Sequence, residues 1–185
     1  MSKQFDALSE DHRAFIKRQK IFFVATAAET GRVNLSPKGM DSFAVLSPNR
    51  VAWLNVTGST NETSAHVQVN PRMTIMFCAF EGKPLILKAF GTAQVVHRAD
   101  PQWAELLALF PSFPGVRQIF DVSIDLVITS CGMSVPTFTY DGERELLNNW
   151  TRGKGEDGIR RYWEQKNQTS IDGLPTHILE RNPAE

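Results

Sequence analysis

The sequence predicts a mainly β protein, a β-barrel with peripheral helices packed outside it, and three observations support this prediction. Six or seven short apolar or alternating runs are separated by tight turns, as in small barrels. These runs follow one another directly and do not alternate with helices, which disfavours a doubly wound parallel sheet. The chain has 185 residues, of which 42% are hydrophobic, enough to build a sizeable core. We expect residues 1–185 to form a single domain, with a helical C-terminal extension from about residue 143.

The first third of the chain predicts one helix and four strands. The segment 8–20 has helix signals at both ends: Ser9 can cap it, acidic residues occupy its first turn, and basic residues occupy its last turn. Residues 21–28 are apolar on both faces and predict a buried strand. Three further strands are expected at residues 32–39, 43–47 and 51–56.

The middle of the chain predicts a hairpin followed by a helix. Residues 73–80 and 85–96 are strand-like, and the turn between them contains Gly and Pro, which is a hairpin pattern. Asp100 and Pro101 then begin a helix, because Asp is a good cap and Pro is tolerated at the first helical position. Four large apolar residues fall on one face of this helix: Trp103, Leu106, Leu107 and Phe110.

The last third predicts one more strand and a pair of helices. Apolar residues alternate through residues 121–130, which predicts one buried face made by Val122, Ile124, Leu126 and Ile128. The helices are expected at about residues 143–150 and 158–166. The stretch GKGEDG at 153–158 matches a dinucleotide-binding pattern, but no strand precedes it and its acidic residues would repel a pyrophosphate. We interpret it as a flexible connector between the two helices.

Charge and termini exclude several classes of protein. Lys plus Arg equals Asp plus Glu, at 20 each, so no overall field attracts the chain to nucleic acid or to an anionic membrane. The N-terminal residues lack the apolar core of a signal peptide, and no apolar run reaches the length of a membrane span. We expect a cytoplasmic protein with reduced thiols.

Hydrolytic and metal chemistry have little support in the sequence. The four His are scattered without metal-ligand spacing, and no Gly-x-Ser-x-Gly turn presents a nucleophilic serine. Cys131 is a candidate reactive thiol, but no His lies near it in sequence. A cysteine that is buried or lies in a dimer interface is the favoured alternative.

The stretch VTGSTNETSAH at residues 56–66 has two readings. Ser59 and Glu62 have the spacing of a helix capping box, which is a purely structural role. The alternative is a phosphate cradle, because Gly58 allows close backbone approach and the first N–H groups of a helix attract anions. A second group of donors, SPKG at 36–39, ends another predicted strand and adds a lysine. The two segments together favour the phosphate cradle.

At this point the sequence resembles the FMN-binding split β-barrel proteins related to pyridoxamine 5'-phosphate oxidase. The resemblance covers residues 22–39 and 51–96, and more loosely 127–144 and 170–175. It implies a homodimer with two FMN sites at the subunit interface. It also implies that residues 34–38 lie along the flavin and that residues 54–63 hold its phosphate. The cofactor-binding residues expected from these segments are Asn34, Leu35, Ser36, Pro37, Lys38, Asn55, Val56, Thr57, Gly58, Ser59, Thr60, Asn61 and Thr63.

The chain departs from the oxidase pattern in two places. Where the oxidase has an arginine–lysine pair, this chain has Asn61, Glu62 and Thr63, so the phosphate is expected to rest on hydroxyl and backbone N–H groups. The C-terminal tryptophan and arginines that hold the oxidase's substrate are not visible. We therefore expect a flavin-dependent oxidoreductase of unknown substrate that does not oxidise pyridoxamine 5'-phosphate. The alternatives are a flavin carrier or redox sensor without turnover, and a structural barrel without a ligand. Three cations are candidate substrate anchors: Lys88, Arg144 and Arg152.

Overall fold

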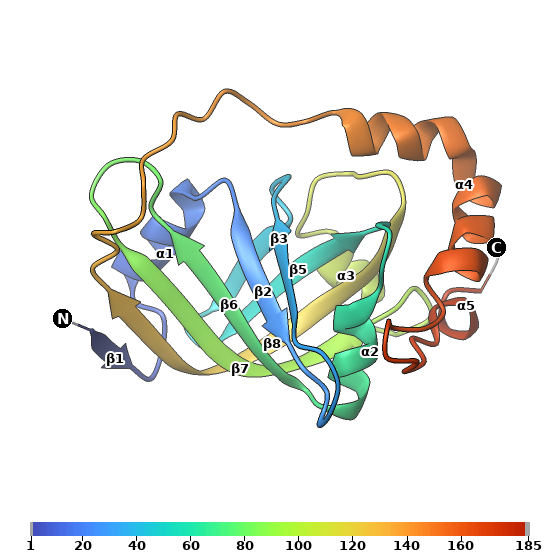
Figure 1. The fold of residues 1–185 in the computed structure, drawn as a ribbon, viewed down its shortest axis with the longest axis horizontal. Helices are drawn as coiled ribbons and strands as arrows, with labels where there is room; N and C mark the ends of the chain where they lie inside the picture. Colours follow the sequence, from blue (N-terminus) through green and yellow to red (C-terminus); the bar gives the residue numbers. More distant parts are fainter. Residues whose placement is uncertain (1, 184–185) are drawn as a thin grey trace.

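An antiparallel sheet of eight strands forms the body of the protein in the computed structural model, which describes residues 2–183 (Figure 1). Its strands are β1 (Lys3–Phe5), β2 (Phe22–Thr26), β3 (Asn34–Lys38), β4 (Phe43–Ser47), β5 (Arg50–Val56), β6 (Arg72–Cys78), β7 (Ile86–Val96) and β8 (Val116–Ser130). They pair in the order β3-β2-β6-β7-β8-β5-β4, and β1 adds to β8. The predicted mainly β fold and the hairpin of β6 and β7 are confirmed, whereas β1 was not predicted.

The curved sheet has its two ends at β3 and β4, which are consecutive in the chain. Residues 39–42 join these strands, yet the pairings between described residues do not connect β3 to β4. The barrel is therefore split along this seam. Pro37 lies in β3, which is paired on one side only, and an edge strand is where a sheet tolerates proline.

Aromatic side chains fill the barrel interior. Trp53 stacks on Phe120 with 4.3 Å between ring centroids, and both are completely buried. Phe22 is edge-on to Trp53, and Phe77 lies beside Phe22. Burial of each large apolar side chain contributes about 1.5–3 kcal/mol, so this cluster stabilises the packing of β2 and β6 against β5 and β8 across the barrel interior.

The alternation predicted for residues 121–130 is half right. The buried residues there are Val122, Ile124, Val127 and Thr129, so the inward face changes after Ile124 and the placement of Leu126 and Ile128 is wrong. The cause is a register shift in the pairing of β8 with β7, at Gly91. A Cβ atom at Gly91 would lie 1.9 Å from the carbonyl oxygen of Ser123, so only glycine fits this close approach.

The helical elements among residues 2–183 lie outside the barrel: α1 (Glu10–Arg18), α2 (Glu62–Val69), α3 (Trp103–Leu107), α4 (Leu146–Lys166) and α5 (Ile178–Arg181). Ser9 caps α1 as predicted, accepting a hydrogen bond from the backbone N–H of His12. The alternative reading of Ser59 and Glu62 as a capping box is wrong, because α2 begins at Glu62, directly after its N-cap Asn61.

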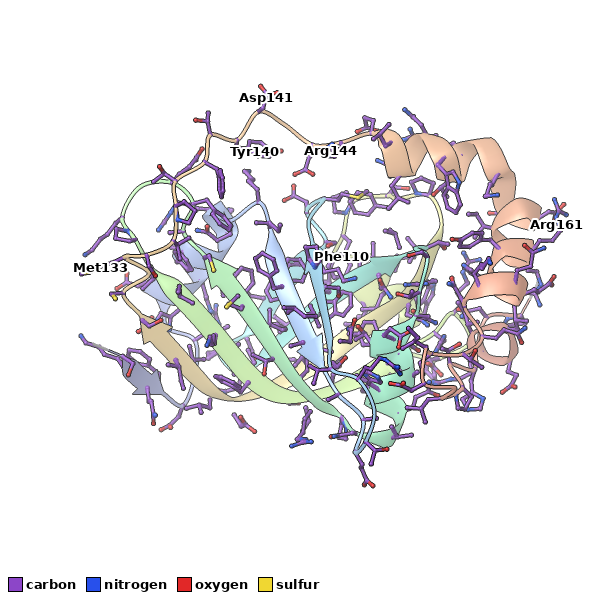
Figure 2. All side chains as sticks on the ribbon, in the orientation of Figure 1. Phe110, Met133, Tyr140, Asp141, Arg144 and Arg161 are labelled. Atoms are coloured by element: carbon purple, nitrogen blue, oxygen red, sulfur yellow. The ribbon has the colours of Figure 1, made fainter. Side chains whose placement is uncertain are left out.

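The predicted pair of helices in the C-terminal extension is confirmed, although both helices are longer than expected. The element α4 (Leu146–Lys166) consists of two helices that meet at a kink at Gly155, whose φ of 63° and ψ of 177° are not helical. The predicted connector is thus reduced to this one glycine. Residues 131–145 cross above the end of the barrel to reach α4, which lies at its side (Figure 1). Tyr140, Asp141 and Arg144 belong to this crossing segment (Figure 2). Within residues 2–183, no helix is both long and apolar enough to span a membrane.

Candidate functional site

A cavity of about 310 Å³ opens at the seam of the barrel, between the end of β3 and the end of β5. Pockets that bind small molecules and cofactors are of this order, about 300–1,000 Å³. Its lining is Ser36, Pro37, Lys38, Gly39, Met40, Ser42, Leu54, Asn55, Val56, Thr57, Gly58, Ser59, Thr60, Phe113, Arg117 and Leu147. The two donor segments found in the sequence therefore meet at one cavity.

Nine of the thirteen predicted binding residues line this cavity: Ser36, Pro37, Lys38, Asn55, Val56, Thr57, Gly58, Ser59 and Thr60. The other four lie elsewhere. Leu35 is an exposed residue of β3, and Asn34 donates its side-chain amide to the hydroxyl of Thr63 at 3.0 Å. Asn61 is buried and donates to the backbone oxygen of Asn167. Asn34, Asn61 and Thr63 thus make contacts within the protein and do not line the cavity.

Two cations face the cavity, and the second was missed in the sequence. Lys38 comes from β3, and Arg117 comes from β8 and is only 4% exposed. Burial, together with the neighbouring charge of Arg117, lowers the pKa of Lys38 to about 8. Burial lowers the pKa of Arg117 to about 9. Both groups are predominantly protonated at pH 7, and the cavity lining contains no carboxylate.

Arg117 owes its position to a β-bulge. In the pairing of β5 with β8, Asn55 lies opposite Gln118 and Val56 lies opposite Val116, so Arg117 is the extra residue on β8. Bulges re-aim side chains and occur often beside functional sites. Sequence alternation cannot reveal this bulge, and the one available signal is a charged residue at the start of an apolar strand.

The guanidinium of Arg117 is only partly satisfied by the protein. Its Nη1 donates to the side-chain oxygen of Asn167 at 2.8 Å, while its Nε has no hydrogen-bond partner among the described residues. Gly58 lies close by, since a Cβ atom there would be 3.9 Å from Nη2 of Arg117. A buried cation without a counter-charge is costly, and an anion in the cavity would remove that cost.

Some of the other polar groups around the cavity have hydrogen-bond partners within the protein, and others do not. The hydroxyl of Thr57 donates to the backbone oxygen of Gly115 and accepts from Nε1 of Trp163, so it is fully used within the protein. The hydroxyl of Ser36 is buried and has no partner within residues 2–183. Ser59 and Thr60 are exposed at the rim. The atoms without a partner, Oγ of Ser36 and Nε of Arg117, can donate hydrogen bonds, which suits a ligand rich in acceptor oxygens such as a phosphate.

The remaining candidates from the sequence lie away from the cavity. Cys131 is exposed, so it is not buried within one chain, and its place in a dimer interface stays a prediction. Lys88, Arg144 and Arg152 do not line the cavity. Residues 2–183 contain no group of three or more metal-ligating side chains. Apart from Lys38, no side chain in the lining is suited to proton transfer at neutral pH.

Comparison with known proteins gives a consistent family. The model of the pyridoxamine 5'-phosphate oxidase family matches residues 8–131. The pyridoxamine 5'-phosphate oxidase family protein ustO of Aspergillus flavus is 38% identical over 202 aligned positions, covering 98% of this chain and 80% of that protein.

Two solved structures have a similar fold. One, provisionally described as a pyridoxamine 5'-phosphate oxidase from Lactobacillus delbrueckii, has a TM-score of 0.54 and 22% identity, covering 66% of this chain and 94% of that chain. The other is HutZ, the heme storage protein of Vibrio cholerae, with a TM-score of 0.50 and 19% identity, covering 68% of this chain and 97% of that chain. At these identities the similarity extends to the fold alone.

Proposed function

Because this chain belongs to the pyridoxamine 5'-phosphate oxidase family, we propose that it binds FMN in the seam cavity and works as a flavin-dependent oxidoreductase. The observation that supports the proposal is a pair of cations, the half-buried Lys38 and the buried Arg117, in a cavity whose lining has no carboxylate. A phosphate monoester carries about 1.5–2 negative charges at pH 7 and accepts several hydrogen bonds. It therefore complements both the charge and the unpartnered donors of this site.

The residues of the chain have distinct roles in this proposal. Lys38 and Arg117 neutralise the phosphate, and Ser59, Thr60 and the backbone at Gly58 donate hydrogen bonds to it. The apolar side chains of Leu54, Phe113 and Leu147 exclude water from the cavity, which strengthens these charge interactions. When bound, FMN supplies the redox chemistry, and the protein supplies orientation and electrostatics.

We also propose that the protein is a homodimer with the flavin at its interface. Support comes from the edge strand β3 and the residue before it, because Leu35 and Val33 are 63% and 74% exposed. Two large aliphatic side chains beside a strand that is paired on one side form a surface that a second subunit can cover. Sedimentation at low micromolar concentration should give about twice the monomer mass, 20.8 kDa. A monomer that binds FMN tightly would exclude the interface site.

The test of the proposed cofactor is a titration of the purified full chain with FMN, following flavin fluorescence. Quenching at micromolar concentration or below is expected, since charge-assisted contacts contribute about 1.5–3 kcal/mol each. No quenching at tens of micromolar would rule out an FMN site. A parallel titration with hemin tests whether this chain binds heme, the ligand that HutZ is described as storing. No histidine lines the cavity, which favours FMN over an iron porphyrin that needs an axial ligand.

Turnover separates an oxidoreductase from a flavin carrier. Arg144 and Arg152, in the crossing segment and α4, lie outside the seam cavity. The two cations inside it, Lys38 and Arg117, are assigned in this proposal to the phosphate of the flavin and not to a substrate. Reduced nicotinamide cofactors should bleach the visible absorbance of the bound flavin, and oxygen should restore it. A flavin that binds but is not bleached by any nicotinamide cofactor would favour the carrier or sensor.

A further inference from the structure

We propose that Asn167, in the C-terminal extension, is a positioning residue for the phosphate site: it aims the guanidinium of Arg117 and the backbone at Gly58 into the seam cavity without neutralising the arginine. Asn167 lies beyond residues 8–131, the part of the chain that the family model matches. The proposal rests on the function proposed above and identifies how the extension serves that site.

The side chain of Asn167 forms hydrogen bonds with both Arg117 and Gly58. Its side-chain oxygen accepts from Nη1 of Arg117 at 2.8 Å, and its side-chain nitrogen donates to the backbone oxygen of Gly58 at 3.1 Å. One amide group therefore joins the two segments that form the cationic end of the cavity. Asn167 is completely buried, so no water competes for these contacts.

Asn167 is itself held in place from three sides. It is the C-terminal cap of α4, and its backbone N–H donates to the oxygen of Trp163 at 3.0 Å. Its backbone oxygen accepts from the side chains of Thr176, at 2.6 Å, and Asn61. Nε1 of Trp163 also donates to Thr57, in the loop after β5. The end of α4 is thereby fastened to the cavity wall.

The neutral amide of Asn167 affects Arg117 differently from the way a carboxylate would. A carboxylate at this position would pair with Arg117 and cancel the charge that an anionic ligand needs. An amide oxygen orients the guanidinium while leaving its full positive charge available. Because one nitrogen of Arg117 is committed to Asn167 and Nε has no partner within residues 2–183, the remaining donors stay free for a ligand.

The chain offers a matched control, Asn182. It is also completely buried, accepts from the backbone N–H of Arg98, and donates to His97 and to the backbone oxygen of Ile178. None of these residues lines the seam cavity. Asn182→Ala therefore removes a buried amide with comparable bonds and leaves the phosphate site intact.

The experiment compares FMN affinity and thermal unfolding of the full chain for Asn167→Ala, Asn167→Asp and Asn182→Ala. Both alanine variants should unfold at lower temperature. Asn167→Ala should weaken FMN about tenfold, the loss of one well-formed hydrogen bond to a charged group, while Asn182→Ala should stay within about twofold of the wild type. Asn167→Asp keeps an acceptor for Arg117 yet should bind FMN more weakly than Asn167→Ala. In an Arg117→Met background, Asn167→Ala should cause no further loss beyond about threefold.

Two results would overturn the positioning role: an Asn167→Ala variant that binds FMN like the wild type, or an Asn167→Asp variant that binds it better than Asn167→Ala. If the wild type itself does not bind FMN, the proposed cofactor is wrong. The same variants are then compared by the rise in unfolding temperature that inorganic phosphate produces. A rise in the wild type that Asn167→Ala loses supports the positioning role for another anion. An equal rise in both refutes it, and no rise in the wild type refutes the anion site as well.

Discussion

Replacing Arg117 with methionine should make the protein more stable without ligand and much weaker in binding FMN. Arg117 is buried and faces no carboxylate in the cavity lining. Its pKa is lowered from 12.5 to about 9 by burial, and at 1.36 kcal/mol per pKa unit this corresponds to about 5 kcal/mol of unfavourable free energy for the charged form. Methionine has a similar length, is flexible, and carries no charge.

The substitution also has a cost, because the side-chain oxygen of Asn167 loses its donor. A buried acceptor left unpaired costs about 1–3 kcal/mol. The expected net gain for the ligand-free protein is therefore about 2–4 kcal/mol, or about 4–16 °C in unfolding temperature for a chain of this size. Loss of two charge-assisted contacts to the phosphate should weaken FMN about 100-fold.

The assay is thermal unfolding of both proteins with and without FMN. At a concentration 100 times its Kd, FMN should stabilise the wild type by about 2.7 kcal/mol, while the variant at the same concentration should gain only about 0.4 kcal/mol. Arg50→Met is the control, since Arg50 is paired with Asp121 at 2.8 Å on the surface and its loss should be nearly neutral for stability and for binding. An Arg117→Met protein that is less stable without ligand and binds FMN normally would show that Arg117 serves the fold.

Five further outcomes are expected. FMN affinity of the wild type should fall between pH 7 and pH 9, because Lys38, with a pKa of about 8 in the free protein, loses its charge over this range. Lys38→Ala should bind FMN about 10- to 100-fold more weakly, with a flatter dependence on pH in the same titrations. Ser59→Ala should weaken FMN less than tenfold and change the free energy of unfolding by under about 0.5 kcal/mol, since Ser59 does not cap α2; a loss near 1 kcal/mol in urea unfolding would restore the capping role. Gly91→Ala should cost more than about 2 kcal/mol in the same assay, because its Cβ would lie 1.9 Å from the oxygen of Ser123, and a neutral result would contradict the bulge. The FMN-loaded protein should form pyridoxal 5'-phosphate from pyridoxamine 5'-phosphate more slowly than about once per minute, far below the roughly 10 per second typical of enzymes.

Local features of this protein were predictable from its sequence. The strands at 21–28 and 51–56, the hairpin of β6 and β7, and the cap of α1 at Ser9 depend on residues near one another in the chain. Hydrophobic periodicity and helix capping depend on residues close together in the chain, so both can be predicted without a structure. The same reasoning selected the two donor segments, and nine of their residues meet at the seam cavity.

Only the tertiary structure decided the second positive charge of that cavity, on Arg117, and the contacts that hold Arg117 in place. Arg117 faces the cavity because a bulge in the β5–β8 pairing makes it the extra residue, and a register shift leaves no trace in the alternation of side chains. Asn167 reaches Arg117 and Gly58 from 50 and 109 residues away. The spacing of Ser59 and Glu62 matches a helix capping box, but no such box forms. Ser59 and Thr60 line the cavity instead, and α2 begins only at Glu62. Contacts between residues so distant in sequence arise only when packing of the whole barrel has fixed which strands and which ends lie together.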